Sequence, residues 1–158
     1  MKDMRRKDRK MEKSEALALL LQNTYGILAT VDSSGQPYGI PLNYAVVNDF
    51  IYFHCAPDGH KLQNIGENHK VCFTVVGRTN VLPEEFSTDY ESVVIFGQAS
   101  RVTQAEEKML ALQEFVKKYS ADFLDQGDIY IEKAKDKVFV FKISIEHCTG
   151  KHRGFGNK

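Results

Sequence analysis

The chain has no excess of charge of either sign. Lysine plus arginine and aspartate plus glutamate each number 21 among the 158 residues, so the formal net charge is zero. Domains that bind nucleic acid usually carry a basic surplus, so this balance argues against such a partner. Long hydrophobic runs are also missing, because no segment approaches the ~18 apolar residues that a membrane-spanning helix needs. We therefore expect neither a nucleic acid nor a membrane as partner.

Cysteine is scarce, and its three positions follow no pairing pattern. Cys55, Cys72 and Cys148 are odd in number and form no C-x-x-C motif. Free thiols in a reducing compartment explain this better than a disulfide frame does, so we expect a cytoplasmic protein. The apolar run ALALLL at 16–21 follows basic residues, but it is too short for a signal-peptide core and no small-residue cleavage site follows it. We interpret it as the apolar face of an N-terminal helix.

The motifs of several enzyme classes are absent as well. The sequence contains no G-x-S-x-G elbow, no G-x-G-x-x-G loop and no G-x-x-x-x-G-K loop. His54 and Cys55 are adjacent in an expected strand, where neighbouring side chains point to opposite faces, so His54 cannot readily activate the thiol. The histidines and cysteines form no recognised zinc spacing, and we predict no metal site.

Hydrophobic periodicity predicts mostly strands. Pro37 and Pro41 cannot donate to a ladder, so the strand that holds them should lie at a sheet edge or be bulged. Gly97 should mark a bend in a later strand, and the segment 78–89 around Pro83 is expected to be a loop. Six runs are rich in β-branched and aromatic residues and bounded by turn residues: 25–31, 36–47, 50–55, 71–77, 91–102 and 137–146.

Helices are expected at three places between these strands. Ser14 should cap a helix at 15–23, and a short helix should begin at His60. The sequence T-Q-A-E from Thr103 matches a capping box for a helix that runs to about residue 119. Strands and helices do not alternate as a doubly wound parallel sheet requires. We therefore predict a mainly β fold, a small antiparallel barrel with peripheral helices.

One domain should hold the whole chain, 1–158, because this length supports one core but not two comfortable ones. Six of the first ten residues are Lys or Arg, so a basic N-terminal segment is expected at 1–13. Charge runs are usually solvent-facing, and the simplest interpretation is a solvated segment. The last residues, 147–158, are expected to form a polar C-terminal tail.

The stretch 51–77 holds the most informative pattern. A strand ends in the turn Pro57-Asp58-Gly59, and His60 and Lys61 stand at the start of the short helix. A helix start offers free backbone N–H groups and the positive end of a dipole, to which these residues add an imidazole and an ammonium group. This combination suits a phosphate group. The residues alone leave open the alternative that His60 and Lys61 are simply exposed.

Ser92 is a second polar residue in an unusual place. It stands one residue inside the expected strand 91–102, and its neighbours there are Val93, Val94, Ile95 and Phe96. A ligand contact and a surface-facing strand serine are equally good interpretations of this position.

Several segments together suggest a family. PLNY, YFHCAPDGHK and YESVVIFG, followed by TGK near the end, resemble the FMN-binding split-barrel proteins, kin of pyridoxamine 5′-phosphate oxidase. Within that family the chain is most similar to the nitroimidazole-resistance (Nim-type) flavoproteins. The resemblance covers nearly the whole chain and implies a six-stranded antiparallel split barrel of Greek-key type. It also implies a homodimer with FMN sites at the subunit interface, although FAD remains open.

The resemblance also implies roles for particular residues. The strand that holds Pro41, Leu42, Asn43 and Tyr44 would lie along the flavin ring. His60 and Lys61 would hold the flavin phosphate. The remaining cofactor-binding residues that it implies lie on other strands and in the tail: His54, Cys55, Ser92 and Lys151.

The chain departs from the oxidase relatives at one point. Those relatives carry an Arg and a Lys around the strand along the ring, in an R-x-x-L-L-K-like run, where this chain has Gly39 through Tyr44. A second phosphate would therefore lose charge-assisted partners worth about 1.5–3 kcal/mol each. Oxidation of a vitamin B6 phosphate is disfavoured, and a small flat redox substrate of lower charge is expected.

The leading hypothesis is an FMN-dependent oxidoreductase that reduces nitro-aromatic acceptors, such as nitroimidazoles. His54 is the candidate catalytic group near the acceptor, and a structural histidine is the alternative. Two other functions stay open. One is a flavin-binding storage or sensing module without robust turnover, and the other is a haem-binding relative of the same fold.

Overall fold

The computed structural model describes residues 3–155. Its strands form one antiparallel sheet in the order β2-β1-β5-β6-β7-β4-β3, with β8 paired to β6 off this path. The strands are β1 (Tyr25–Val31), β2 (Pro37–Asn43), β3 (Ala45–Val47), β4 (Phe50–Cys55), β5 (Lys70–Leu82), β6 (Ser87–Arg101), β7 (Phe139–Ser144) and β8 (His147–Arg153). The helices are α1 (Lys13–Gln22), α2 (His60–Glu67), α3 (Ala105–Tyr119) and α4 (Leu124–Ala134), with 3₁₀ turns at Lys7–Arg9, Pro83–Glu85 and Ala121–Phe123.

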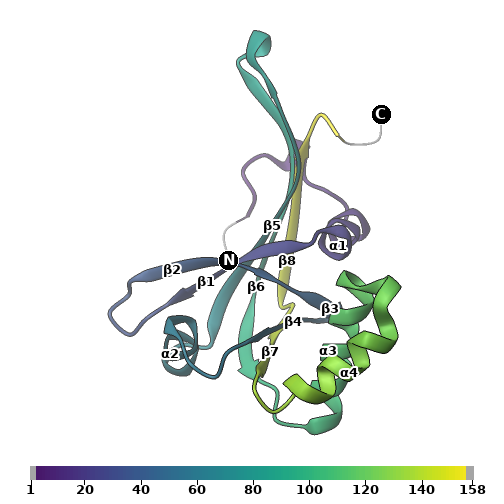
Figure 1. Cartoon of the computed structure of the whole chain (residues 1–158). Helices are drawn as coiled ribbons and strands as arrows, with labels where there is room; N and C mark the ends of the chain where they lie inside the picture. Colours follow the sequence, from purple (N-terminus) through teal and green to yellow (C-terminus); the bar gives the residue numbers. More distant parts are fainter. Residues whose placement is uncertain (1–2, 156–158) are drawn as a thin grey trace.

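The sheet curls into a barrel wall that does not close. The end strands β2 and β3 are consecutive in the chain, with only Tyr44 between them, but they pair with different neighbours. Figure 1 shows β2 and β4 diverging from β3, with α2 near their far ends. Strand β6 joins the two parts of the wall, because it pairs with β5 along most of its length, with β8 at Tyr90–Phe96 and with β7 at Ala99–Arg101.

Two hydrophobic clusters hold these layers together. The first fills the barrel interior, with fully buried residues such as Leu28, Phe73 and Ile95. The second lies between the outside of β3, β4 and β7 and the helices α3 and α4, and it includes Tyr52 and Phe115. Because side chains alternate between the two faces of a strand, β4 contributes residues of one face to the first cluster and of the other face to the second. Helices therefore cover only part of the outside of the wall.

Tyr44 stands at the break between β2 and β3 and is fully buried. Its hydroxyl donates to the carbonyl of Leu20 in α1. Its backbone N–H donates to the hydroxyl of Tyr119 (2.9 Å), which lies 2.5 Å from the carbonyl of Thr24 and 2.8 Å from that of Tyr44. A hydroxyl has one proton, so it donates to one of these two carbonyls. This network connects α1, α3 and the start of β1 at the point where the strand changes partners.

Lys118 packs beside this network. Its ammonium lies 3.8 Å from the centroid of the Tyr44 ring, and its buried Nζ has no hydrogen-bond partner among the described residues. Burial lowers the pKa of Lys118 to about 8. The face of the aromatic ring is the group that stabilises this cation.

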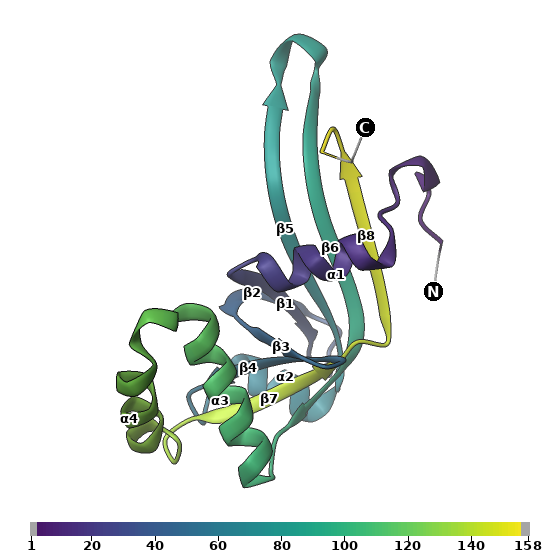
Figure 2. The same ribbon diagram turned by 90° about the vertical axis from the view of Figure 1, so that its right-hand side faces the viewer.

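The longest strands continue well beyond the barrel. β5 and β6 project as a two-stranded ribbon, here called the β5–β6 arm (residues 79–90), which Figures 1 and 2 show standing away from the body. A bulge between Val76 and Thr79 marks its base, and the turn Pro83–Glu85 marks its tip. The prediction of a loop at 78–89 was wrong, because Pro83 begins only a short turn and the flanking residues pair as strands.

Other boundaries also differ from the sequence prediction. The first helix begins at Lys13, with Glu12 as its N-cap in place of Ser14, and the Glu12 N–H donates to the Glu15 carboxylate (3.0 Å). The N-cap of α3 is Gln104, and no side chain caps it, so the capping box expected at Thr103 is not formed. The long second strand is divided at Tyr44 into β2 and β3.

Two further elements were not predicted. The helix α4 has a glycine and two aspartates in its sequence, which weaken its helical signal, and it buries only Gly127 and Ile131. Residues 147–153, expected as tail, form β8 along β6, while 156–158 lie outside the described residues. The predicted count of six strands is therefore corrected to eight in a sheet that is not closed. The mainly β antiparallel fold with peripheral helices is confirmed, and it is consistent with a split barrel.

The N-terminal segment is less free than its composition suggests. Lys10 forms a β-bridge with Lys151, and the N–H of Met11 donates to the carbonyl of Gly150 (3.0 Å). Met11 is buried in the barrel cluster. All three cysteines are free thiols. No helix in the described part of the chain is long and apolar enough to cross a membrane.

Gly97 marks the bend that the sequence predicted, where β6 leaves β5 and β8 for β7. A Cβ on Gly97 would lie 1.7 Å from the Ser144 carbonyl oxygen, so Gly97→Ala should lower the free energy of unfolding by about 1–3 kcal/mol or more. Gly66 in α2 has open space around it, and Gly66→Ala should raise that free energy by up to ~1 kcal/mol. Urea unfolding of both variants measures the difference, and equal effects would contradict this account of the bend.

Candidate functional site

The side chains of the predicted flavin-binding strand divide between the two faces of the barrel wall. Leu42 packs against the interior cluster and Tyr44 is fully buried in it. Pro41 and Asn43 alternate with them and are exposed on the outside. A ligand on the outside of β2 would therefore meet Pro41 and Asn43, while the side chains of Leu42 and Tyr44 support the strand from within.

The same division separates the two neighbours at the end of β4. Cys55 packs against the interior cluster, and burial raises the pKa of its thiol, an effect that the charge of Lys61 partly offsets. His54 points outward and meets the ring of Phe115 in α3 edge-on, with centroids 4.7 Å apart. The surrounding protein partly shields the imidazole from water and lowers the pKa of His54, which favours the neutral ring although the residue is exposed.

An opening in the wall lies between β2 and the end of β4. β3 pairs with β4 at Ala45↔Tyr52, so a continued antiparallel ladder would place Asn43 opposite His54. No such pairing forms: β2 is an end strand of the sheet, paired with β1 on its other side, and this edge is free. Pro37 and Pro41 lie on this edge strand, as the sequence predicted. Backbone groups along both sides of the opening are available to a ligand.

The start of α2 lies at the far end of the same opening. His60 and Lys61 occupy its first turn, and Gly59 precedes them with φ 141°, a conformation that favours glycine. The His60 ring packs against Tyr38 of β2, with centroids 4.3 Å apart. Buried Asn64 donates to the Thr30 hydroxyl (2.9 Å) and fixes the helix against β1. The helix start is thus a rigid group of N–H donors beside a lysine, as an anion site requires.

Ser92 and Lys151 are brought together on the outside of the wall. They are direct neighbours in the ladder between β6 and β8, and Ser92 also faces Val76 of β5. The side chains in such a row share one face of the sheet. This side of the wall, called the outer face below, carries large exposed or partly exposed apolar residues on three strands: Tyr25, Ile27, Val76, Val94 and Phe96.

The predicted residues on the outside of the wall and at the helix start form one surface with two parts, whereas Leu42, Tyr44 and Cys55 lie on the interior side. The opening between β2 and β4 holds Asn43 and His54 near the barrel and His60 and Lys61 at the helix start. The outer face with Ser92 and Lys151 adjoins it across β1 and β5. The surface is open rather than enclosed.

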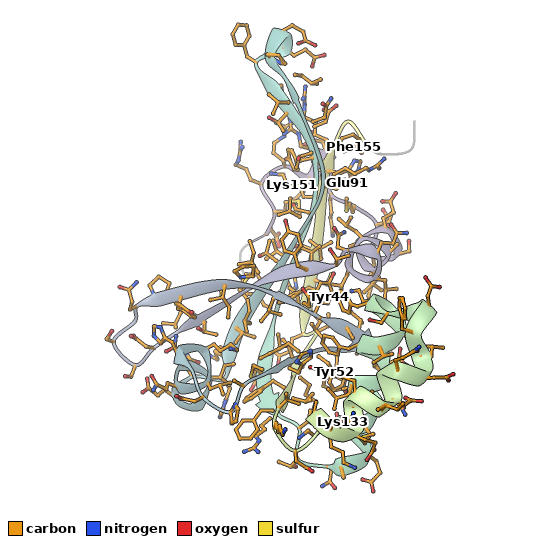
Figure 3. The ribbon with its side chains drawn as sticks, viewed as in Figure 1. Tyr44, Tyr52, Glu91, Lys133, Lys151 and Phe155 are labelled. Carbon is orange, nitrogen blue, oxygen red and sulfur yellow. The ribbon has the colours of Figure 1, made fainter. Side chains whose placement is uncertain are left out.

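A cavity of about 610 Å³ lies elsewhere, between α1 and the base of the arm. None of the predicted site residues lines it. Its lining includes Glu15, the imidazole of His152 and the ion pair Arg78–Glu91, in which the guanidinium donates to both carboxylate oxygens (2.7 and 3.0 Å). Figure 3 labels Glu91 and Phe155 on this side of the molecule. Nothing in the sequence indicated this cavity, because it depends on the unpredicted strand pairing of β5, β6 and β8.

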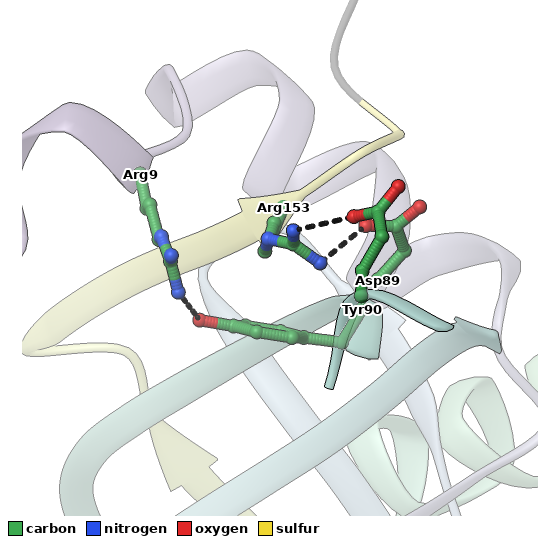
Figure 4. Close-up of polar contacts among 5 residues, drawn as sticks. Arg9, Asp89, Tyr90 and Arg153 are labelled. Carbon is green, nitrogen blue, oxygen red and sulfur yellow. Dashed lines mark hydrogen bonds and ion pairs between the residues drawn. The ribbon is translucent and has the colours of Figure 1, made fainter. Parts of the chain in front are cut away.

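Two ion pairs connect the arm to the C-terminal strand, and a hydrogen bond connects it to the N-terminal segment. Arg153 donates to Asp89 and to Glu85 (3.1 Å each), and Arg9 donates to the hydroxyl of Tyr90 (3.4 Å) (Figure 4). The alternation of β-branched and polar residues in 79–90 was the available signal for this strand extension. No cluster of three metal-ligating side chains occurs within residues 3–155.

Comparison with known proteins agrees with this architecture. The chain is similar to the structure of a proposed 5-nitroimidazole antibiotic resistance protein from Bacteroides thetaiotaomicron, with 27% identity over 90% of this chain and 86% of that one, and a TM-score of 0.77. It also resembles the conserved hypothetical protein Rv2991 from Mycobacterium tuberculosis (19% identity, 99% and 96% coverage, TM-score 0.82). A third similar structure is an FAD-binding protein from Mesorhizobium loti (24% identity, 92% and 98% coverage, TM-score 0.66).

No curated protein matches the chain significantly by sequence. The model of one family, described as pyridoxamine 5′-phosphate oxidase, matches residues 12–152, which is most of the chain. This match covers every strand except the last residue of β8 and includes all the predicted site residues. The chain therefore belongs to the pyridoxamine 5′-phosphate oxidase family.

Proposed function

We propose that this protein is an FMN-dependent oxidoreductase of nitroreductase type that works as a homodimer in the cytoplasm. The observation that carries the proposal is the arrangement of the opening between β2 and β4, with a helix start and Lys61 at one end and the apolar outer face at the other. FMN is an elongated molecule with a phosphate at one end and a flat ring at the other, and both ends find suitable surroundings here. The FAD-binding relative from Mesorhizobium loti supports a flavin, and FAD would use the same surface.

The phosphate would bind at the start of α2. Backbone N–H groups of the first turn, the helix dipole and the Lys61 ammonium all favour an anion at this point. His60 would add a donor from the ring that packs on Tyr38. His60 packs on Tyr38, which is opposite Thr30 in the β1–β2 ladder, and from Thr30 to Tyr25 at the other end of β1 is five residues, or about 17 Å of extended strand. An FMN molecule lying along β1 and β2 would therefore reach the outer face.

The flavin ring would lie on the outside of β2, against Pro41 and Asn43, with Ser92 and Lys151 beyond it. This surface is apolar and exposed in the single chain, and large exposed apolar patches mark interaction sites. A second copy packed on the outer face would cover both the patch and the ring. The proposal therefore places two flavin sites at the interface of a homodimer.

The substrate would be small, flat and of low charge. Neither Gly39 nor Tyr44 supplies a cation beside β2, and Tyr44 is buried, so nothing there would hold the phosphate of a vitamin B6 compound. Nitro-aromatic acceptors fit this requirement, and the similarity to the Bacteroides protein supports the same class. His54 is the polar side chain nearest the opening on β4, and its neutral ring would donate to or accept from the acceptor.

Bound FMN would supply the electron transfer, and the protein would hold and orient the reactants. Lys61 would fix the phosphate, the outer face would support the ring, and the second subunit would exclude water. No strong general base is required for this role.

Lys61→Glu places a negative charge at the phosphate position, so the purified variant should lose nearly all of its FMN. Absorption spectra and the small molecule released on denaturation measure this loss. Lys137→Glu, an exposed residue next to β7, makes the same charge change elsewhere and should retain the cofactor. Full FMN occupancy in the Lys61 variant would refute the phosphate site, and a Soret band in the wild-type protein would indicate haem instead.

Anaerobic mixing of the photoreduced protein with a nitroimidazole tests the reaction itself. The flavin spectrum should return to the oxidised form as the nitro compound is consumed, because electrons pass from the bound flavin to the acceptor. Flavin that stays reduced under these conditions would favour a storage or sensing module.

The pH dependence of the free energy of unfolding should reveal the lowered pKa of His54. The folded state lowers its pKa, so the unfolded chain binds the proton more tightly and stability falls as the pH drops below the ordinary value of about 6.5. Urea unfolding at pH 7.5 and pH 5 should show a smaller decline for His54→Gln than for the wild type. An identical pH dependence would mean that His54 titrates as if it were fully in water.

A further inference from the structure

The β5–β6 arm has little in the described chain to pack against. Val81 is 68% exposed, and Phe86 at the tip is 98% exposed. A two-stranded ribbon is at best marginally stable in water unless it packs against something. Phe86 also has φ 49°, a left-handed conformation that is unusual for a bulky residue and gives an aromatic side chain no intrinsic advantage there. A partner surface would account for both features.

The arm continues the outer face of the sheet. The bulge inserts one residue after Val76, so the ladder resumes at Thr79↔Tyr90 and continues to Val81↔Thr88. As a result Val81 lies on the same side as Val76 and Ser92. One strip of exposed apolar residues therefore runs from the barrel to the arm, through the surface where we propose the dimer interface.

The two ends of this ribbon carry opposite charges. Glu84 and Glu85 lie at the tip, and Glu85 is paired with Arg153. Lys70 begins β5 at the other end and is exposed beside Gln98, near Phe96 of β6. Neither Glu84 nor Lys70 makes an ion pair with any residue between 3 and 155. Glu84 at the tip of one copy could therefore meet the opposite charge of Lys70 in a second copy.

Symmetry decides how two such ribbons would meet. A two-fold axis parallel to the strands would place acidic tips together, whereas an axis across the strands makes the ribbons antiparallel and pairs each tip with the Lys70 end. Val76 is the midpoint of the 13-residue β5, so an axis there brings Lys70 of one copy beside Leu82 of the other, next to the tip. Ser92, opposite Val76, lies at the same centre.

We propose that the β5–β6 arm is a clasp between two copies of this chain, in which residues 83–86 dock on the outer face near Lys70 and Phe96 of the second copy. The proposal rests on the homodimer of the proposed function and adds the elements that hold it together. Glu84 faces Lys70 across the interface, and Phe86 covers the exposed ring of Phe96.

Charge reversal tests the pairing. Sedimentation equilibrium should show that Glu84→Lys and Lys70→Glu each raise the dimer dissociation constant about tenfold, since each contact occurs twice in the dimer. The double variant restores opposite charges and should return to within about threefold of the wild type. Lys133→Glu on α4 makes the same charge change at an exposed site far from the arm (Figure 3) and should leave the constant unchanged.

Removal of the tip aromatic tests the apolar contact. Phe86→Ser should raise the dissociation constant about 100-fold or more, because two rings lose their buried surface. Tyr130→Ser removes a 69% exposed aromatic from α4 and serves as the matched control. Since neither residue belongs to the core, the unfolding of the monomer should be unchanged in both variants, measured at protein concentrations below their dissociation constants.

The outcomes separate this proposal from the proposed function. A dimer that is equally tight in Glu84→Lys, Lys70→Glu and Phe86→Ser overturns the clasp, while FMN retained in the same samples leaves the flavin assignment standing. Weakened dimers in these variants without FMN in the wild type support the clasp and overturn the flavin assignment. A wild-type monomer at millimolar concentration overturns the clasp and the interface site together.

Discussion

The hydroxyl of Tyr119 fixes the point at which the barrel wall opens. It accepts a hydrogen bond from the N–H of Tyr44, the one residue between β2, which pairs with β1, and β3, which pairs with β4. A side chain from α3 thus satisfies a backbone group that no strand satisfies, and an unsatisfied group at this buried position would cost about 1–3 kcal/mol. The Tyr44 hydroxyl extends the same connection to α1. The position of two helices and the divergence of β2 from β4 depend on this contact.

The opening places the candidate site on the outside of the barrel. β3 pairs with β4, but β2, on the other side of Tyr44, does not. The free edges of β2 and β4 and the start of α2 therefore border the opening, while the barrel interior stays filled by its own side chains. The helices α3 and α4 cover the neighbouring part of the wall through the second cluster. The uncovered remainder is the outer face. A cofactor and a second subunit would therefore share the same surface, and neither would require a cavity within the chain.

The sequence predicted the local structure around the candidate site better than it predicted the limits of the strands. The turn before His60, the edge position of the proline strand and the bend at Gly97 depend on local chemistry, and local chemistry can be interpreted from single residues. The length of β5 and β6 could not be inferred, because Pro83 indicated a loop and only the pairing of distant residues reveals the strands around it. The burial of Tyr44 was hidden for the same reason, since its partner Tyr119 lies 75 positions away. These features depend on contacts between residues far apart in the sequence, which local sequence patterns do not indicate.

The bulge after Val76 has a consequence for how the arm can vary in length. Side chains alternate along a strand, so adding one residue to each strand of a ribbon turns its tip to the opposite side. Adding two residues to each strand restores the original side and moves the tip about 7 Å farther out. The single extra residue of the bulge sets which side Val81 occupies. Lengthening each strand of the arm by two residues would preserve the direction of the tip, whereas lengthening each by one residue would reverse it. Insertions in this segment are thus constrained by parity as well as by size.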